Sequence, residues 1–121
     1  MNLILAIDQS TSATKAVLFD AAGKVVDKAS RAHRQIYPQP GRVEHDAEEI
    51  WSNTLAAAGE VIARNPGRGI ACVSIANQRE TVVVWDRASG RPLHHALVWQ
   101  DRRGDDLCQR LDAGGYGDMV R

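Results

Sequence analysis

Two apolar segments near the N-terminus, residues 3–7 and 16–19, are separated by a short stretch of mostly small and polar residues, DQSTSATK, and the second strand is expected at 14–19. Apolar runs of this length are typical of β-strands, and so short a link turns the second strand back beside the first. A tight turn at residues 20–23, DAAG, and a further segment at 24–30 predict a third strand in a β-meander. Because residues 3–7 are continuously apolar, we expect that strand to be covered on both faces.

The remainder of the chain alternates helical and strand patterns. Asp46 is expected to be the N-cap of a helix with Glu49 at capping-box spacing, and residues 65–67, NPG, end it. An apolar stripe at helical spacing follows the cap: Trp51, Leu55, Ala58 and Ile62. Residues 36–45 are expected to form a loop, 70–76, 82–85 and 96–98 strands, 86–92 a turn, 101–111 a helix and the last residues a loose end. The pattern predicts an α/β fold with a mixed sheet.

Composition excludes several classes of function. The chain has 121 residues, 44% hydrophobic and 25% charged, which suits one globular domain, and its 15 basic and 15 acidic residues cancel. It therefore lacks the charge excess expected for binding nucleic acid or a membrane surface. No apolar run approaches the roughly 20 residues of a membrane span, and no signal peptide is recognisable. Cys72 and Cys108 are expected to be reduced, structural thiols in a cytoplasmic protein.

The corner between the first two strands is the first candidate site. Asp8 ends an apolar strand, and small or hydroxyl residues follow it, so their backbone N–H groups and Oγ atoms could face an anion. Asp8 would hold Mg²⁺ directly or through water, and Lys15 would add positive charge near phosphates. The alternative is an ordinary hairpin turn with a solvated Asp8. The stretch lacks the glycine patterns of a P-loop or a Rossmann site.

Two further segments carry chemistry. Arg79 and Glu80 lie in NQRET, between two predicted strands, and offer donors and acceptors together to a ligand with several hydroxyls. The alternative there is a solvated polar turn with a weak ion pair. Trp99 ends a short apolar run and could pack against the carbon skeleton of a polyol. Alternatively, Trp99 is a core residue that precedes a helix N-cap at Asp101.

Four stretches in this order resemble the FGGY family of carbohydrate kinases: AIDQSTSATKAVLFD, QIYPQPGRVEHDAEEIW, SIANQRETVVVWDRASGRPL and ALVWQDRR. NQRET with VWQ.RR is most similar to the members that act on glycerol, whereas the DQ.T start is shared across the sugar kinase, actin and Hsp70 superfamily. The resemblance implies an RNase H-like mixed sheet with flanking helices. It implies that residues 1–121 are the N-terminal part of the first of two domains. The second domain is absent from this chain, and the catalytic base is expected beyond Arg121.

The resemblance also implies roles for individual residues near the nucleotide. Asp8 lies near Mg²⁺, Thr11 and Ser12 line the phosphates, and Lys15 takes the place of a basic residue that contacts phosphate. Thr11 also approaches the phosphoryl group of the product. Ser10 replaces a usual glycine, so its Cβ affects how close the backbone comes to phosphate.

The resemblance further implies a role for Ala13 in the corner and roles for three residues that bind the polyol. Ala13 stands where glycerol-phosphorylating members commonly have a hydroxyl residue, so only its backbone is available to the nucleotide. Arg79 and Glu80 hydrogen-bond the hydroxyls of glycerol, and Trp99 packs on its carbons.

The implied function is phosphorylation of glycerol to glycerol 3-phosphate with ATP and Mg²⁺, in the cytoplasm. Another polyol or ketose, such as a tetritol or a pentulose, is an alternative substrate. An alternative of another class is a nucleotide switch of the actin or Hsp70 type without a small substrate, and a third is a module of 121 residues that acts alone. The expected partners are the polyol and the missing second domain, with no nucleic acid and no membrane span. Homo-oligomerisation stays open.

Overall fold

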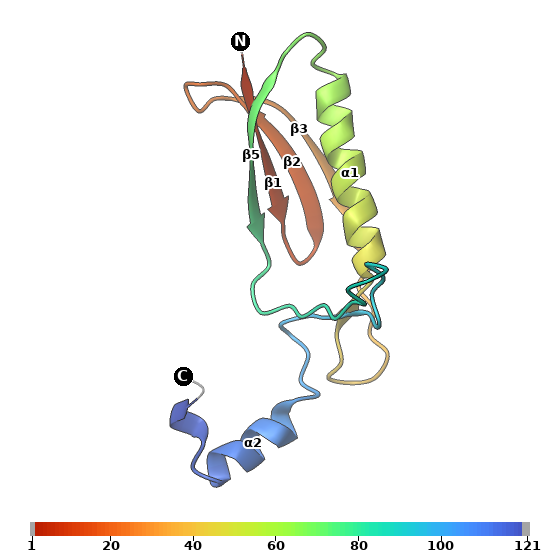
Figure 1. Cartoon of the computed structure of the whole chain (residues 1–121), viewed down its shortest axis with the longest axis vertical. Helices are drawn as coiled ribbons and strands as arrows, with labels where there is room; N and C mark the ends of the chain where they lie inside the picture. The colour runs from red at the N-terminus through yellow and green to blue at the C-terminus, as the bar shows by residue number, and fades with distance from the viewer. Residues whose placement is uncertain (1, 120–121) are drawn as a thin grey trace.

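The computed structural model describes residues 2–119. Its elements are β1 (Leu3–Gln9), β2 (Ala13–Phe19), β3 (Val25–Ala32), β4 (Glu44–His45), α1 (Ala47–Ala63), β5 (Ile70–Asn77), β6 (Ala96–Leu97), α2 (Asp105–Ala113) and a 3₁₀ turn at Gly117–Met119. The main sheet has the order β3-β2-β1-β5. Strands β1, β2 and β3 are antiparallel neighbours, and β5 runs parallel to β1. The predicted β-meander and mixed sheet are confirmed (Figure 1).

The turn between β2 and β3 forms as its residues predict. Gly23 has a φ of +77°, which residues with a Cβ rarely adopt. Asp20 Oδ1 accepts hydrogen bonds from the backbone N–H groups of Ala22 and Lys24, at 3.0 and 2.9 Å. These two bonds fix the turn without any contribution from the rest of the chain, so the meander is specified locally.

Helix α1 begins at the predicted cap. Asp46 Oδ1 accepts hydrogen bonds from the backbone N–H groups of Glu48 and Glu49, which would otherwise lack partners at a helix start. The reciprocal half of a capping box is not used. Glu49 instead accepts a 2.7 Å hydrogen bond from the backbone N–H of Arg34, and this bond attaches the helix start to the segment after β3.

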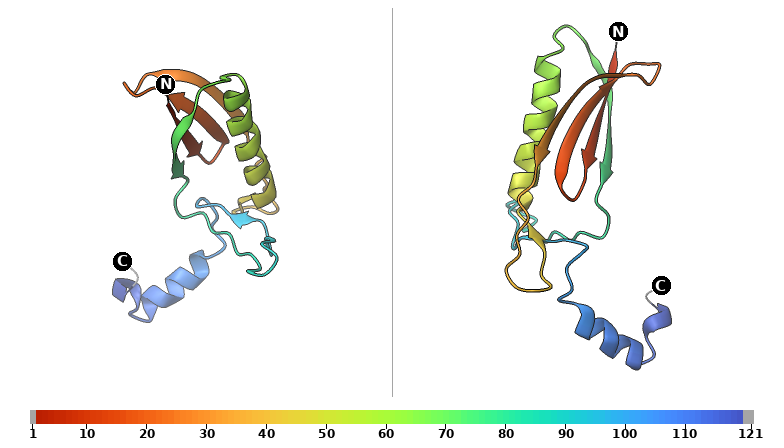
Figure 2. Two further views of the ribbon diagram at one scale, coloured as in Figure 1. Left: turned by 45° about the horizontal axis from the view of Figure 1, so that its top comes forward. Right: turned by 180° about the vertical axis from the view of Figure 1, so that it is seen from behind.

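The core lies between α1 and one face of the sheet (Figure 2). It consists of small and branched apolar side chains: Leu3, Leu5, Ile7, Ala16, Leu18, Ala29, Ala57 and Val61. The expectation that residues 3–7 are covered on both faces is wrong for the described residues, because Ile4 and Ala6 on the opposite face stay half-buried. Because α1 packs on one face of the sheet only, buried and half-buried residues alternate along β1.

Three residues of the predicted stripe on α1 are exposed, Trp51, Leu55 and Ile62, and of the four only the partly buried Ala58 packs against the core. Trp51 is 60% exposed and Leu55 54% exposed, and the sheet instead contacts the side that carries Ala57 and Val61. The small Ala57 allows α1 to approach the sheet closely. Apolar spacing alone therefore indicated a helix but not which side of it faces the core.

Four further expectations need correction. Residues 82–85 make isolated bridges to two different segments, Val82 to Leu97 and Trp85 to Pro92, so neither pairing extends into a strand. The expected helix at 101–111 begins instead at Asp105, with Gly104 as its N-cap. Residues 36–45 are a loop only as far as β4, which pairs with β6, and the expected loose end contains the 3₁₀ turn.

Both cysteine thiols, Cys72 and Cys108, are free and exposed, so neither is a buried structural group among the described residues. Within residues 2–119, no helix combines the length and the apolar character needed to cross a membrane.

Candidate functional site

The corner between β1 and β2 exposes backbone donors. The N–H and the hydroxyl of Ser10 both donate to the carbonyl of Ala13, at 3.0 and 2.7 Å, which closes the turn. Gln35 Nε2 donates to the carbonyl of Thr11 at 3.1 Å. The backbone N–H groups of Thr11 and Ser12 donate to no acceptor within residues 2–119. Free N–H groups beside two hydroxyls are the chemistry that binds an anion such as phosphate.

Asp8 and Lys15 face each other across the β1–β2 pair. They are register partners, and Lys15 Nζ lies 3.1 Å from Asp8 Oδ2. Both side chains are about half exposed, so this ion pair contributes only about 0–1 kcal/mol to stability. A ligand that carries phosphate and a cation can therefore separate the two charges at small cost.

The loop after β5 reaches the same end of the sheet because β5 is parallel to β1 and pairs with it up to Asn77. The charged groups of Arg79 and Glu80 form no hydrogen bond or ion pair with any residue in 2–119. Glu80 has a φ of +67°, a left-handed conformation that costs a non-glycine residue roughly 1–3 kcal/mol. Strain of this kind concentrates at functional sites, and here it accompanies two charges that lack partners among the described residues.

Trp99 joins the corner to the loop. Its indole Nε1–H donates to Thr11 Oγ1 at 2.9 Å, and its backbone N–H donates to Thr81 Oγ1 at 3.3 Å. The side chain is 51% exposed, so the alternative of a core tryptophan is wrong. The alternative of a helix N-cap at Asp101 is also wrong, because this carboxylate accepts from the backbone N–H of Val43 and from Arg103. An apolar ring face thus remains free for a ligand.

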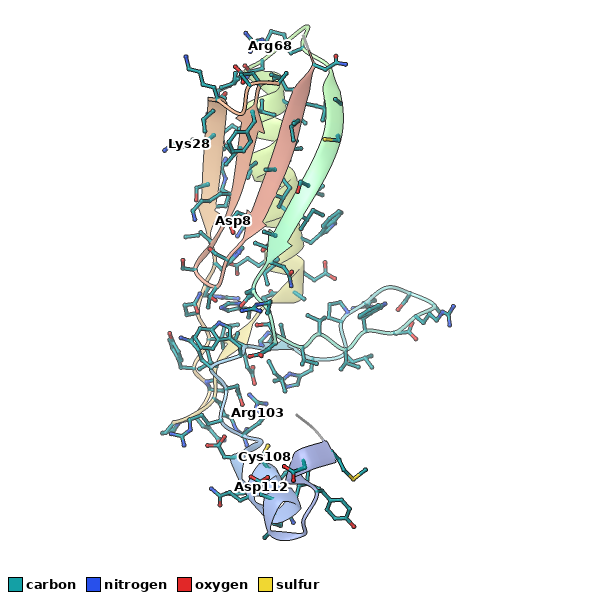
Figure 3. All side chains as sticks on the ribbon, turned by 90° about the vertical axis from the view of Figure 1, so that its left-hand side faces the viewer. Asp8, Lys28, Arg68, Arg103, Cys108 and Asp112 are labelled. Atoms are coloured by element: carbon teal, nitrogen blue, oxygen red, sulfur yellow. The ribbon has the colours of Figure 1, made fainter. Side chains whose placement is uncertain are left out.

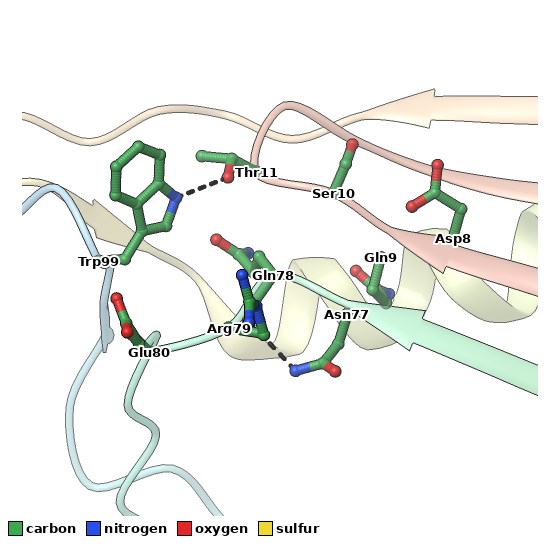
Figure 4. A pocket seen from close by; sticks show the side chains of 9 residues that line it. All are labelled: Asp8, Gln9, Ser10, Thr11, Asn77, Gln78, Arg79, Glu80 and Trp99. Carbon is green, nitrogen blue, oxygen red and sulfur yellow. Dashed lines mark hydrogen bonds between the residues drawn. The ribbon is translucent and has the colours of Figure 1, made fainter.

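These three features surround one pocket of about 470 Å³ (Figure 4), within the range of small-molecule sites. Its lining consists of Asp8, Gln9, Ser10, Thr11, Asn77, Gln78, Arg79, Glu80 and Trp99. The structure therefore brings together six of the predicted site residues from segments up to about ninety positions apart. The other three, Ser12, Ala13 and Lys15, belong to the same corner but do not line the pocket.

Three lining residues were not predicted individually: Gln9, Asn77 and Gln78. Gln9 directly follows Asp8, and the two amides directly precede Arg79, so the signal was adjacency to a predicted residue at a strand end. Gln78 continues the pairing of the strands, since its backbone N–H donates to the carbonyl of Gln9 at 2.6 Å. This bond holds the start of the loop after β5 beside the end of β1.

The donor set fits a nucleotide-borne magnesium ion but not an all-protein metal site. Within residues 2–119, no group of three or more histidine, cysteine, aspartate or glutamate side chains could hold a metal. Magnesium that arrives with a nucleotide keeps several waters and needs only one or two carboxylates. The half-exposed carboxylate of Asp8 can supply one of them.

The strain at Glu80 predicts a difference between two variants. Glu80→Gly is expected to be about 1 kcal/mol more stable than Glu80→Ala, because only glycine adopts a positive φ without a Cβ clash. Both variants remove the carboxylate, so their difference in stability reports the backbone alone. Urea unfolding monitored by circular dichroism measures the difference. Equal stability of the two variants would show that the backbone at position 80 is unstrained.

A β-hairpin corner with free backbone donors, facing a charged loop and an exposed indole, defines a small-molecule site on an α/β fold of the sugar kinase type. The family model described as the FGGY family of carbohydrate kinases, N-terminal domain, matches residues 3–121. The chain belongs to this family. It is 48% identical over 120 residues to a glycerol kinase of Chromobacterium violaceum and 50% identical over 120 residues to one of Burkholderia pseudomallei. Each match covers 98% of this chain and 24% of the relative, so the chain spans about a quarter of their length.

Solved structures agree with the family assignment. A Plasmodium falciparum glycerol kinase with ADP superposes with a TM-score of 0.87 and 39% identity, over 93% of this chain and 23% of that one. A xylulose kinase from Lactobacillus acidophilus gives a TM-score of 0.92 over 99% of this chain and 24% of that one, but at 23% identity. The second likeness establishes the fold alone. The expected RNase H-like fold class is confirmed.

Proposed function

We propose that the protein containing this chain transfers the γ-phosphoryl group of ATP to a hydroxyl of glycerol, forming glycerol 3-phosphate. The observation that carries the proposal is the single pocket in which Thr11, Arg79, Glu80 and Trp99 meet. Support comes from the relatives at 48% and 50% identity, which are glycerol kinases. Residues 1–121 would form the start of the first of two domains, acting in the cytoplasm, with the catalytic base and the rest of the cleft supplied by later residues.

In this proposal the chain's own residues bind and orient both reactants. The guanidinium of Arg79 donates to glycerol oxygens, the carboxylate of Glu80 accepts from glycerol hydroxyls, and the indole of Trp99 covers the carbon chain. On the facing side, the free N–H groups and hydroxyls of Thr11 and Ser12 bind phosphate oxygens. Mg²⁺ bound with the nucleotide would neutralise charge on the phosphates.

Positioning carries most of the catalysis in this scheme, because phosphoryl transfer depends chiefly on alignment and electrostatic stabilisation. Ser10 and Ala13 bond to each other within the turn, so their contribution to the nucleotide is to shape the corner. Asp8 would hold a water or the magnesium ion, and Lys15 would turn from Asp8 toward phosphate.

The test is a comparison of substrates with the complete protein that contains this chain. Initial rates with MgATP are measured on glycerol, a tetritol and a pentulose, together with ATP hydrolysis in the absence of any polyol. We expect kcat/KM for glycerol to exceed that for the pentulose by at least about tenfold, since small pockets discriminate by roughly 1–3 kcal/mol per methylene-sized change. Faster transfer to the pentulose would reject glycerol, and polyol-independent hydrolysis alone would favour a nucleotide switch.

A further inference from the structure

The corner, the loop after β5 and Trp99 are joined by a closed ring of side-chain hydrogen bonds. The ring passes through three residues that line the pocket and three that do not: Thr11, Gln35, His45, Gln78, Thr81 and Trp99. One of its six bonds, from the indole to Thr11, is drawn in Figure 4. The ring is therefore a physical connection between the side of the pocket that faces phosphate and the side that faces the polyol.

His45 occupies the centre of this connection. Its Nε2 lies 2.8 Å from Gln35 Oε1, and its Nδ1 lies 3.3 Å from Gln78 Nε2. Since an amide oxygen only accepts and an amide nitrogen only donates, His45 must carry its proton on Nε2 and accept on Nδ1. Gln35 then uses its own amide nitrogen to donate to the carbonyl of Thr11 at 3.1 Å. In the bonds that join Gln78, His45, Gln35 and Thr11, each donor therefore meets an acceptor, and only this tautomer of His45 satisfies all of them.

Burial favours the neutral form of the His45 imidazole, which is the form that the ring of hydrogen bonds requires. His45 is fully buried, and the side chain of His33 lies beside it with ring centroids 6.0 Å apart. Burial lowers the pKa of His45, repulsion from His33 lowers it further, and Glu49 opposes both effects. Protonation of Nδ1 would place a donor against the donor of Gln78 and break the ring there.

We propose that His45, acting with Gln35, is a positioning residue that sets the separation between the phosphate corner and the polyol loop. This inference rests on the proposed function. Neither residue lines the pocket, so neither touches substrate. Their effect on the reaction is exerted through Thr11 and Gln78. Misplacement of reacting groups by about 1 Å can cost roughly 10²-fold in rate.

His33 provides a matched control because it shares the environment of His45 but not the ring. It is 6% exposed, its pKa is also lowered by burial, and its ring nitrogens face Thr14 and Asn53, each at 3.1 Å. A substitution at either histidine disturbs the same buried layer. Only substitution of His45 opens the connection between corner and loop.

The experiment compares His45→Phe, which keeps an aromatic ring but no hydrogen bonds, with His33→Phe in the complete protein. For His45→Phe we expect kcat for glycerol phosphorylation to fall by about 10²-fold while KM for glycerol rises less than about tenfold. His33→Phe should keep kcat within about threefold. If His45→Phe does not fold, His45→Gln keeps the donor to Gln35 and should show a smaller loss of kcat. Equal kcat values for the two histidine variants would overturn the proposal.

A second readout does not depend on the reaction. Hydrogen exchange of the Trp99 indole N–H, followed by NMR, reports the bond to Thr11 directly. We expect faster exchange in the His45 variant and unchanged exchange in the His33 variant. Unchanged exchange in both would overturn the positioning role even if the protein phosphorylates glycerol. Faster exchange in the His45 variant of a protein without kinase activity would reject the proposed function and keep the connection between corner and loop.

Discussion

Replacing Arg79 with alanine is expected to lower kcat/KM for glycerol phosphorylation by about 10²- to 10⁴-fold, since a guanidinium that makes two charged hydrogen bonds to substrate supplies roughly 1.5–3 kcal/mol per bond. The reason lies in the geometry of the loop. Arg79 lines the pocket and has no partner within residues 2–119, so its binding capacity is available to a ligand. Steady-state rates and calorimetric binding of glycerol measure the loss.

The matched control for Arg79 is Arg87→Ala. Arg87 is exposed in the turn after residue 86, forms no ion pair among the described residues and lies outside the pocket. Its replacement removes the same charge from the same segment, and kcat/KM should stay within about twofold. If Arg79→Ala binds glycerol as well as the unchanged protein does, the loop is not the polyol site, and the nucleotide-switch alternative gains support.

Replacing Arg103 with alanine is expected to lower the melting temperature by about 10 °C, because the change leaves two buried carboxylates without their partner. Arg103 donates to Glu44 at 2.6 Å and to Asp101 at 2.8 Å, and these carboxylate side chains are only 7% and 5% exposed. Asp101 also fixes the backbone of Val43, and Arg103 lies between the main sheet and α2 (Figure 3). Differential scanning calorimetry measures the change.

The control for Arg103 is its neighbour. Arg102 is 75% exposed and pairs only with Asp105, three residues along the chain, so Arg102→Ala should change the melting temperature by less than about 2 °C. Equal effects of the two variants would show that the buried cluster contributes no more than a surface ion pair.

The cluster of Glu44, Asp101 and Arg103 also predicts how the difference in stability between the unchanged protein and Arg103→Ala depends on pH. Hydrogen bonds from Arg103 lower the pKa of Glu44 and of Asp101 below their ordinary values of 4.5 and 3.8. A lowered pKa stabilises the folded state above the ordinary value, and that stability is lost as the pH falls toward the folded-state pKa. The difference between the unchanged protein and Arg103→Ala should therefore be full above about pH 5 and shrink below about pH 4. A difference that grows on acidification would contradict the assignment.

Local patterns predicted much of the fold. The turn at Asp20 and the cap at Asp46 use side chains that bond within a few residues, so the sequence around them is sufficient to specify them. The apolar stripe on α1 predicted a helix but not its buried side, because Trp51 and Leu55 share helical spacing with core positions and only packing distinguishes the two sides. Asp101 was mistaken for a cap because its partners, Val43 and Arg103, include one from a distant segment.

The candidate site was predicted in pieces and not as a whole. Asp8, Arg79 and Trp99 were identified from strand ends and from the family resemblance, but no local pattern says that their segments meet. Their meeting depends on parallel pairing of β5 with β1 and on the bond from Trp99 to Thr11. The hydrogen bonds of His45 were not predicted, since Gln35, His45 and Gln78 are brought together only by the folded chain.

A crystal structure of the complete protein with glycerol and MgADP tests the central claim most directly. It should place the glycerol carbons against the Trp99 indole, with glycerol oxygens within hydrogen-bond distance of Arg79 and Glu80. The terminal phosphate of ADP should lie at the backbone N–H groups of Thr11 and Ser12. Glycerol bound elsewhere, or a nucleotide whose phosphates do not reach the corner between β1 and β2, would contradict it.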